Sequence, residues 1–187
     1  VKGDDDKSII TFLWPADVKG SKMLTHTHKK DDDDQWLFLP ALKRVKRISS
    51  RSKTGSFMGS EFSYEDLSSQ EIEKYKYKWL RDEKFNGEDH WVIERFPIDS
   101  KSGYKRQVVW LSKKILHASK VDYYDRKNEL LKTATFHDYV KLKRWWRPGS
   151  IKMINHQTKK SSILKWKNRK IGLKFSAKDF HKNSLKE

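Results

Sequence analysis

The sequence contains no cysteine, which excludes disulfide bonds, thiolate-ligated zinc sites and cysteine nucleophiles. It also lacks any apolar run that approaches the roughly 20 residues needed for a membrane-spanning helix, and no signal peptide is visible. A G-x-S-x-G nucleophile elbow, an H-x-x-x-H pair and a carboxylate pair in an apolar setting are absent as well. Nothing in the sequence therefore invites an enzymatic mechanism.

Hydrophobic residues are scarce for a folded chain, at 35% of 187 residues. Aromatic residues nevertheless make up 13%, including 8 tryptophans, and each aromatic side chain buries a large area. A 22.4 kDa chain fits one domain and can bury roughly 70% of its unfolded surface. We therefore expect one folded domain, spanning residues 1–187, with a thin and aromatic-rich apolar layer.

Acidic residues are outnumbered, with 25 Asp and Glu against 42 Lys and Arg, which gives a formal net charge of +17. Such a charge favours anionic partners, namely nucleic acid, an anionic lipid surface or an acidic protein. The alternative is a solvated basic surface that contributes only to solubility.

Alternation of apolar and polar residues with period two dominates the chain and predicts β-strands. The predicted strands cover 8–15, 21–28, 35–42, 43–48, 74–80, 89–98, 105–112, 119–125 and 129–142, with a last hairpin over 149–167. Two segments are helix candidates: 68–75 has a helix start signal, with a single turn as the alternative, and 176–186 has the apolar positions Phe180 and Leu185. The pattern predicts an antiparallel all-β fold, which could be a barrel, an open barrel or a sandwich.

The segment KYKYKWL over 74–80 has the cleanest alternation. It places Tyr75, Tyr77 and Trp79 on one face of a strand and the lysines on the other. A platform for single-stranded nucleic acid needs stacking rings and cations together. The separation therefore favours aromatic side chains that face a core or a cavity, and makes nucleic-acid binding the weaker alternative.

The segment SKTGSFMGSEFSYEDL over 52–67 combines glycines with aromatic residues. It is not a Walker loop, because Lys53 and Thr54 precede Gly55 instead of following the second glycine. Its apolar residues should pack either on the core of the protein or around the mouth of a ligand cavity. Glycine permits the tight backbone turns that either arrangement needs.

Two histidines, His26 and His28, share one face of a predicted strand, and Asp31 to Asp34 follow. Two imidazoles and a carboxylate could bind a divalent metal. The alternative, which we favour, is a solvent-facing strand edge that leads into a polar turn, so we expect neither a metal nor a cofactor.

Four segments together resemble a known family. They are PADVKGSKMLTH (15–26), QWLFLPALKRVKRISSRSKTGSFMGSEFSYEDL (35–67), KVDYYDRKNELLKT (120–133) and MINHQTKKSSIL (153–164). The resemblance is to the LolA-like outer-membrane lipoprotein-sorting family. It covers nearly the whole chain, and segment 35–67 is its most specific part.

The resemblance implies a strongly curved antiparallel sheet that forms an unclosed half-barrel with helical lid elements. It also implies a non-enzymatic periplasmic carrier that holds lipid or lipoprotein acyl chains in an apolar cavity and moves them toward the outer membrane. An RND-type exporter of the inner membrane is the implied protein partner, and an anionic membrane surface is a further candidate. Members of the family begin with a signal peptide, a helix and first strands, and we expect these to be missing from this chain.

Alternation along the predicted strands, read together with the resemblance, gives candidate site residues. The expected cavity lining is Phe12, Trp36, Phe38, Tyr75, Tyr77, Trp79, Trp91, Ile93, Val109 and Leu111. The expected gate or rim is Gly55, Phe57, Met58, Gly59, Phe62 and Tyr64. The expected headgroup or membrane-docking charges are Lys43, Arg44, Lys46 and Arg47. The alternative function is a protein–protein adaptor of an envelope exporter that carries no lipid.

Overall fold

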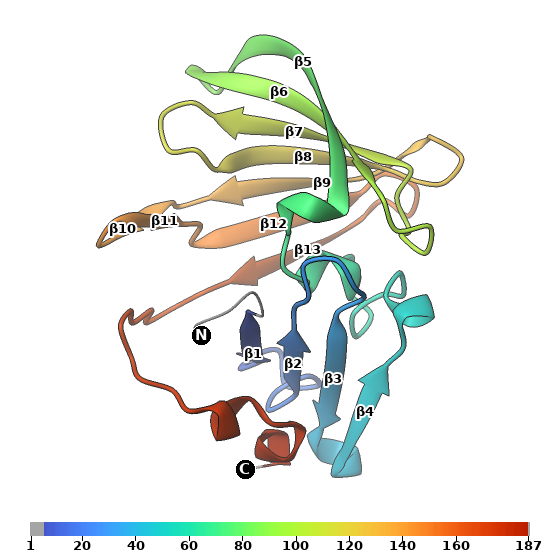
Figure 1. Cartoon of the computed structure of the whole chain (residues 1–187), viewed down its shortest axis with the longest axis vertical. Helices are drawn as coiled ribbons and strands as arrows, with labels where there is room; N and C mark the ends of the chain where they lie inside the picture. The colour runs from blue at the N-terminus through green and yellow to red at the C-terminus, as the bar shows by residue number, and fades with distance from the viewer. Residues whose placement is uncertain (1–5, 187) are drawn as a thin grey trace. The chain divides into compact units, whose positions relative to one another are not determined.

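The computed structural model describes residues 6–186 of the chain (Figure 1). They group into two compact units that alternate along the sequence. Unit 1 comprises Val1–Met58, Ser63–Lys74 and Gly172–Glu187, and unit 2 comprises Gly59–Phe62 and Tyr75–Ile171. Composition alone gave no sign of this division, because no Gly/Pro-rich linker separates the units.

Unit 1 is built on a four-stranded antiparallel sheet in the order β1-β2-β3-β4. The strands are β1 Lys7–Thr11, β2 Lys22–His26, β3 Asp34–Leu39 and β4 Arg44–Ile48. All four were predicted, and each is shorter than expected. Met23 and Leu24 of the central strand β2 are fully buried, together with Leu185 near the C-terminus. Phe12, Leu37, Ile48 and Phe57 are buried in unit 1 as well.

Unit 2 contains a seven-stranded antiparallel sheet in the order β13-β12-β9-β8-β7-β6-β5 and a separate hairpin, β10-β11. The strands are β5 Tyr75–Phe85, β6 Glu88–Pro97, β7 Arg106–Ser112, β8 Ala118–Tyr124, β9 Leu130–His137, β10 Val140–Leu142, β11 Trp145–Arg147, β12 Ser150–Asn155 and β13 Lys160–Lys165. The edge strands β5 and β13 are not paired with each other, so the sheet stays open, and Figure 1 shows it strongly twisted. The predicted antiparallel, unclosed β-architecture is confirmed.

The described part of the chain contains no α-helix, and its helical elements are short 3-10 turns. They are η1 Pro40–Leu42, η2 Ser50–Ser52, η3 Glu65–Leu67, η4 Ile72–Lys74, η5 Ala177–Phe180 and η6 Lys182–Lys186. The segment 68–75, where a single turn was the alternative to a helix, contains only the turn η4, and the helix predicted over 176–186 is replaced by the turns η5 and η6. In the second segment, Ser176 and Asp179 form a capping box, but His181 is extended and ends η5 after one turn.

Local turn chemistry explains the long hairpin of β5 and β6. Asn86 and Gly87 connect the strands with φ angles of 51° and 80°, as a two-residue hairpin turn with positive φ requires. Asn-Gly is the residue pair that favours this turn, so the sequence FNGED between the predicted strands 74–80 and 89–98 indicates the hairpin. The hairpin β10-β11 was missed, because Asp138, with φ 56°, ends β9 inside what looked like one continuous strand.

Apolar side chains lie on both faces of the seven-stranded sheet. Val92, Val108 and Trp110 form a buried cluster on one face, to which Leu80, Phe85 and Tyr124 add. Val109, Val121, Ala134 and Met153 are buried on the other face. Successive side chains of a strand point to opposite faces of the sheet. One short apolar run such as QVVWLS in β7 therefore supplies buried side chains to both faces.

Candidate functional site

Seven predicted lining residues lie on one face of the seven-stranded sheet. Trp79 of β5 is opposite Ile93 of β6, which in turn is opposite Val109 of β7. Residues directly opposite each other in a ladder share a face. We call the resulting set the aromatic face, and it consists of Tyr75, Tyr77, Trp79, Trp91, Ile93, Val109 and Leu111.

Much of the aromatic face is accessible at the β5–β6 side of the sheet. Trp79 is 62% exposed and Tyr77 is 48% exposed, whereas Trp91, Ile93 and Leu111 are half-buried. Monomeric proteins seldom expose contiguous apolar surface of this kind without a binding role. The aromatic face is therefore the first candidate site.

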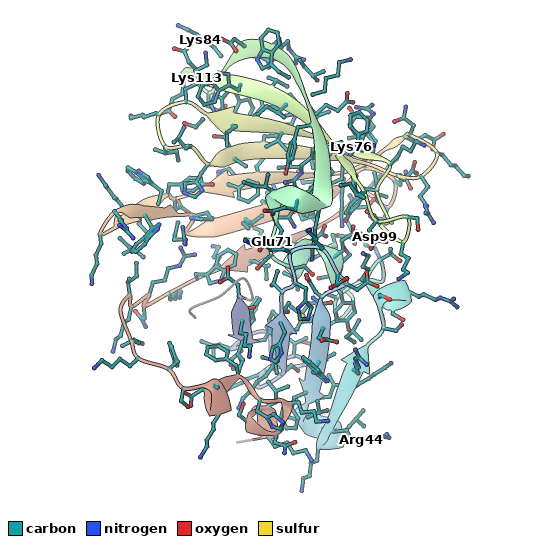
Figure 2. The ribbon with its side chains drawn as sticks, viewed as in Figure 1. Arg44, Glu71, Lys76, Lys84, Asp99 and Lys113 are labelled. Atoms are coloured by element: carbon teal, nitrogen blue, oxygen red, sulfur yellow. The ribbon has the colours of Figure 1, made fainter. Side chains whose placement is uncertain are left out.

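Cations border the aromatic face. The Arg95 guanidinium lies 4.6 Å from the centre of the Tyr75 ring, and the Lys113 ammonium lies 5.4 Å from the centre of the Trp91 ring. Figure 2 shows Lys113 at the same end of the sheet as Lys84 of β5. The charge of Lys113 is paired with Asp82 at 2.6 Å. The arrangement is therefore apolar at its centre with Arg95 as the cation at its margin, which suits a ligand with an apolar body and an anionic head.

The other end of the same face is covered within unit 2 by the inserted segment Gly59–Phe62. The backbone N–H of Glu61 donates to Ser162 Oγ at 3.1 Å, and Asn155 Nδ2 donates to Glu61 Oε2 at 2.7 Å. The Lys132 ammonium donates to the Glu61 carbonyl at 3.3 Å. These bonds fix the covered end and leave the β5–β6 side as the accessible part.

The remaining predicted lining residues, Phe12, Trp36 and Phe38, belong to unit 1. Phe12 is buried with its ring 4.7 Å from the ring of Phe57. Trp36 packs edge-on against His26 at 5.0 Å. Trp36 and Phe38 lie in β3 of the four-stranded sheet, and Phe12 directly follows β1 of that sheet. The period-two pattern does not tell which sheet a strand joins, so the three residues could not be separated from the aromatic face in advance.

The loop over 52–67 uses its aromatic residues for packing. Phe57 and Phe62 are each only 3% exposed, and the Phe57 ring lies 5.4 Å from that of Tyr64. Burial raises the pKa of the Tyr64 phenol. Met58 and Gly59 adopt positive φ at the tip. This favours the core alternative for Phe57 and Phe62, and the gate or rim role of the loop stays a prediction.

A pocket of about 320 Å³ opens in unit 2, and sequence reasoning missed it. Its walls are Phe85, Asn86, Glu88, His90, Lys114, Ile115, Ser119, Thr135, Phe136, His137, Tyr139 and Trp146. His90, Thr135 and His137 alternate with residues of the aromatic face or its continuation, so their side chains point to the opposite face of the sheet. None of the predicted lining residues belongs to this pocket.

The polar groups of the pocket are mostly paired with one another. His90 is 1% exposed, with Nδ1 2.8 Å from the Glu88 carbonyl and Nε2 2.7 Å from Ser119 Oγ. The Tyr139 hydroxyl donates to the Ala118 carbonyl at 2.7 Å, and burial raises its pKa well above the usual range. The two charged wall residues, Glu88 and Lys114, pair with each other at 3.5 Å. The remaining walls are rings and neutral groups, so the pocket suits an uncharged or apolar ligand.

The histidine and aspartate cluster is divided among separate partners. His26 Nε2 lies 2.8 Å from the Phe180 carbonyl, whereas His28 Nε2 lies 3.3 Å from Asp34 Oδ2. Burial alone would raise the pKa of Asp34, but hydrogen bonds from Arg47 and His28 lower it. Residues 6–186 contain no group of three or more His, Cys, Asp or Glu side chains that could hold a metal ion.

The predicted docking charges lie on or next to β4. Lys43, Arg44, Lys46 and Arg47 are all exposed, and Figure 2 shows Arg44 at the start of the strand. Arg47 forms an ion pair with Asp34, so part of this charge is neutralised. Their docking role stays a prediction. Among the residues described here, no helix has the length and apolar character to cross a membrane.

Comparisons with known proteins agree with this architecture. A family model described as an uncharacterized protein matches residues 4–187. A crystal structure from Vibrio parahaemolyticus, of a domain ascribed to outer membrane lipoprotein sorting, is 52% identical with a TM-score of 0.90, and the match covers 100% of this chain and 80% of that one. No curated protein matches the chain.

Two further structures are similar. A DUF1329 family protein from Desulfovibrio piger is 34% identical with a TM-score of 0.89, over 97% of this chain and 77% of that one. A LolA superfamily protein from Nitrosomonas europaea has a TM-score of 0.75 at 23% identity, over 98% and 79%, which supports the fold alone. This chain therefore belongs to the LolA-like family of outer-membrane lipoprotein-sorting proteins.

Proposed function

We propose that this protein is a periplasmic carrier that binds the acyl chains of lipids or lipoproteins on the aromatic face and moves them toward the outer membrane. The observation that carries the proposal is the accessible aromatic surface of β5, β6 and β7, centred on Trp79. The relatives support it, since the 52% identical domain is ascribed to lipoprotein sorting.

The physical basis is the removal of acyl chains from water. Each methylene group shielded from water contributes about 0.8 kcal/mol. Large rings on paired strands offer apolar contact area at a small entropy cost, because the sheet already holds their backbone. A surface that leaves Trp79 and Tyr77 partly exposed shields a chain incompletely, which favours release to an acceptor.

The proposal has two further parts. The protein catalyses no reaction, and an RND-type membrane exporter donates the lipid to it or accepts the lipid from it. Supporting the first part, the polar groups of His90 and Tyr139 in the pocket are engaged in structural hydrogen bonds. The exporter partnership follows from the family resemblance.

The test is native mass spectrometry of the protein purified from envelope extract, followed by extraction and identification of lipids. We expect a bound species at the mass of a phospholipid or of a lipoprotein acyl group. The double variant Y77A/W79A should lose that species by at least tenfold, because it removes the exposed rings. The control W14A removes a tryptophan that is 82% exposed in unit 1 and should retain the lipid.

An adaptor that docks to an exporter without carrying lipid is the second candidate, since exposed aromatic residues flanked by arginine are also typical of protein interfaces. A clean unbound mass, with no uptake of added phospholipid, contradicts the carrier proposal. If a purified exporter then binds the wild type but not Y77A/W79A, the adaptor function is supported.

A further inference from the structure

Two connections of unit 2 flank the pocket at one end of the seven-stranded sheet. They are the β7–β8 loop over 113–117 and the hairpin β10-β11, which Figure 1 shows at the same end of the sheet. The His117 ring stacks on Tyr139 at 5.7 Å, and the Tyr139 hydroxyl donates to the Ala118 carbonyl. Lys114 and Ile115 of the loop and Trp146 of the hairpin line the pocket. The two connections therefore form one continuous surface around its walls.

This surface exposes apolar side chains at both connections. Leu116, with φ 55°, is 64% exposed in the loop. In the hairpin, Val140 and Trp145 are 44% and 39% exposed. Leu142 is opposite Trp145 in the ladder and shares its face with Val140. Trp146 lies on the other face of the hairpin, toward the pocket. The hairpin therefore carries Val140, Leu142 and Trp145 on one face and lines the pocket with the other.

The chain from the hairpin to the end of unit 2 carries charge of one sign, whereas Glu88 at the pocket is paired with Lys114. Residues 139–171 contain eleven Lys and Arg and no Asp or Glu, although the full chain has 25 acidic residues. Four of these cations are on or next to the hairpin strands: Lys141, Lys143, Arg144 and Arg147. The ion pairs found among residues 6–186 include none of these four. The Arg144 guanidinium instead lies 4.4 Å from the centre of the Trp145 ring.

We propose that this end of unit 2 docks on the surface of an anionic lipid bilayer, with Trp145, Val140 and Leu116 in the headgroup region and the hairpin cations on the lipid phosphates. The combination of exposed apolar side chains with hairpin cations is the reason for choosing a lipid bilayer as the partner. Tryptophan is enriched where an apolar medium meets water, and basic residues near an anionic leaflet add to the attraction. An acidic protein or nucleic acid would also bind these cations, but it would give no role to the exposed apolar side chains of Leu116, Val140 and Trp145.

The docking surface goes beyond the carrier proposal and does not depend on any bound cargo. It also differs from the predicted docking charges on β4, where Arg47 is already paired with Asp34. Docking would bring the pocket walls Trp146 and Tyr139 close to the membrane. The two are tested separately, because one assay measures extracted lipid and the other measures vesicle binding.

The test is flotation of the delipidated protein with vesicles of equimolar phosphatidylglycerol and phosphatidylcholine, compared with vesicles of phosphatidylcholine alone. We expect clear binding only to the anionic vesicles. The double variant K143E/R144E should weaken binding more than about tenfold, because it reverses two charges at the surface. W145A should weaken it by about fivefold or more through the loss of an interfacial ring.

The matched control is K174E/K178E in the C-terminal segment of unit 1, where both lysines are exposed, and it changes the net charge by the same amount. It should bind within about twofold of the wild type, and circular dichroism should show all variants folded. Equal loss in both double variants would mean that only diffuse charge matters and would overturn the proposal. So would no vesicle binding at all, equal binding to the neutral vesicles, or unchanged binding of K143E/R144E.

Discussion

At the scale of single residues, His117 is a titratable side chain within the proposed docking surface. Its ring stacks on Tyr139 and closes the contact between the β7–β8 loop and the hairpin. Burial, together with the positive charge of Arg147, lowers its pKa from the ordinary value of 6.5. The folded state therefore disfavours the protonated ring, and the neutral ring is the form that the packing stabilises.

The direction in which stability changes with pH follows from the difference between the pKa of His117 in the folded and unfolded states. Because the folded-state pKa is lowered, His117 contributes stability above pH 6.5 that is lost as the pH falls through its folded-state pKa. We expect the Tm of the wild type to fall over this acidic range more steeply than that of H117F, which keeps a ring but cannot be protonated. The measurement is thermal unfolding by circular dichroism as a function of pH. The control H181F should follow the wild type, and parallel curves for H117F and the wild type would contradict the expectation.

At the scale of elements, the C-terminal 3-10 turn η6 is held by one side chain. Leu185 is fully buried in unit 1, where η6 contacts β2, β3 and β4. The surrounding residues Lys182 to Ser184 are polar and add little apolar area. A turn this short has no cooperative stability of its own, so the leucine anchors the whole segment.

Leu185→Ala should therefore lower the free energy of unfolding by about 2–5 kcal/mol, the range for a leucine removed from a packed core. Urea unfolding followed by tryptophan fluorescence gives this value. Leu173→Ala is the matched control, since Leu173 is 57% exposed and its removal should have little effect. Equal effects of the two substitutions would show that η6 does not depend on this contact.

At the scale of the whole molecule, the net charge of +17 acts on stability and on partners together. Like charges repel in the folded state, and the acid-free stretch 139–171 concentrates this repulsion in unit 2. Added salt screens the repulsion, since the Debye length is about 10 Å at 0.1 M and grows at lower salt.

We therefore expect the Tm to rise when NaCl is increased from about 20 to about 300 mM, while binding to anionic vesicles weakens over the same range. Differential scanning fluorimetry and flotation measure the two effects. Potassium chloride serves as the control for a specific effect of sodium and should act equally. A Tm that falls with salt would mean that attractive ion pairs, such as Arg106 with Glu94 at 3.0 Å, outweigh the repulsion.

The sequence by itself determined most strands of unit 2 and the faces of its large sheet, although not the β10-β11 hairpin. Period-two alternation placed Tyr77, Trp79 and Ile93 on one side, and the ladder confirms that they share it despite the bulge between Trp79 and Arg81. Alternation survives because side-chain direction in a strand is a local property of the backbone. The turn at Asn86 and Gly87 was predictable for the same reason.

Only the tertiary structure decided which strands share a sheet and where a cavity opens. Phe12 and Trp36 alternate like the other lining residues, yet they belong to unit 1. The pocket near His90 joins residues up to about 60 positions apart, which no local pattern connects. Sheet membership and the position of the pocket depend on pairing and packing between residues that are distant in the sequence. Alternation, turns and charge depend on neighbouring residues and can be identified from the sequence.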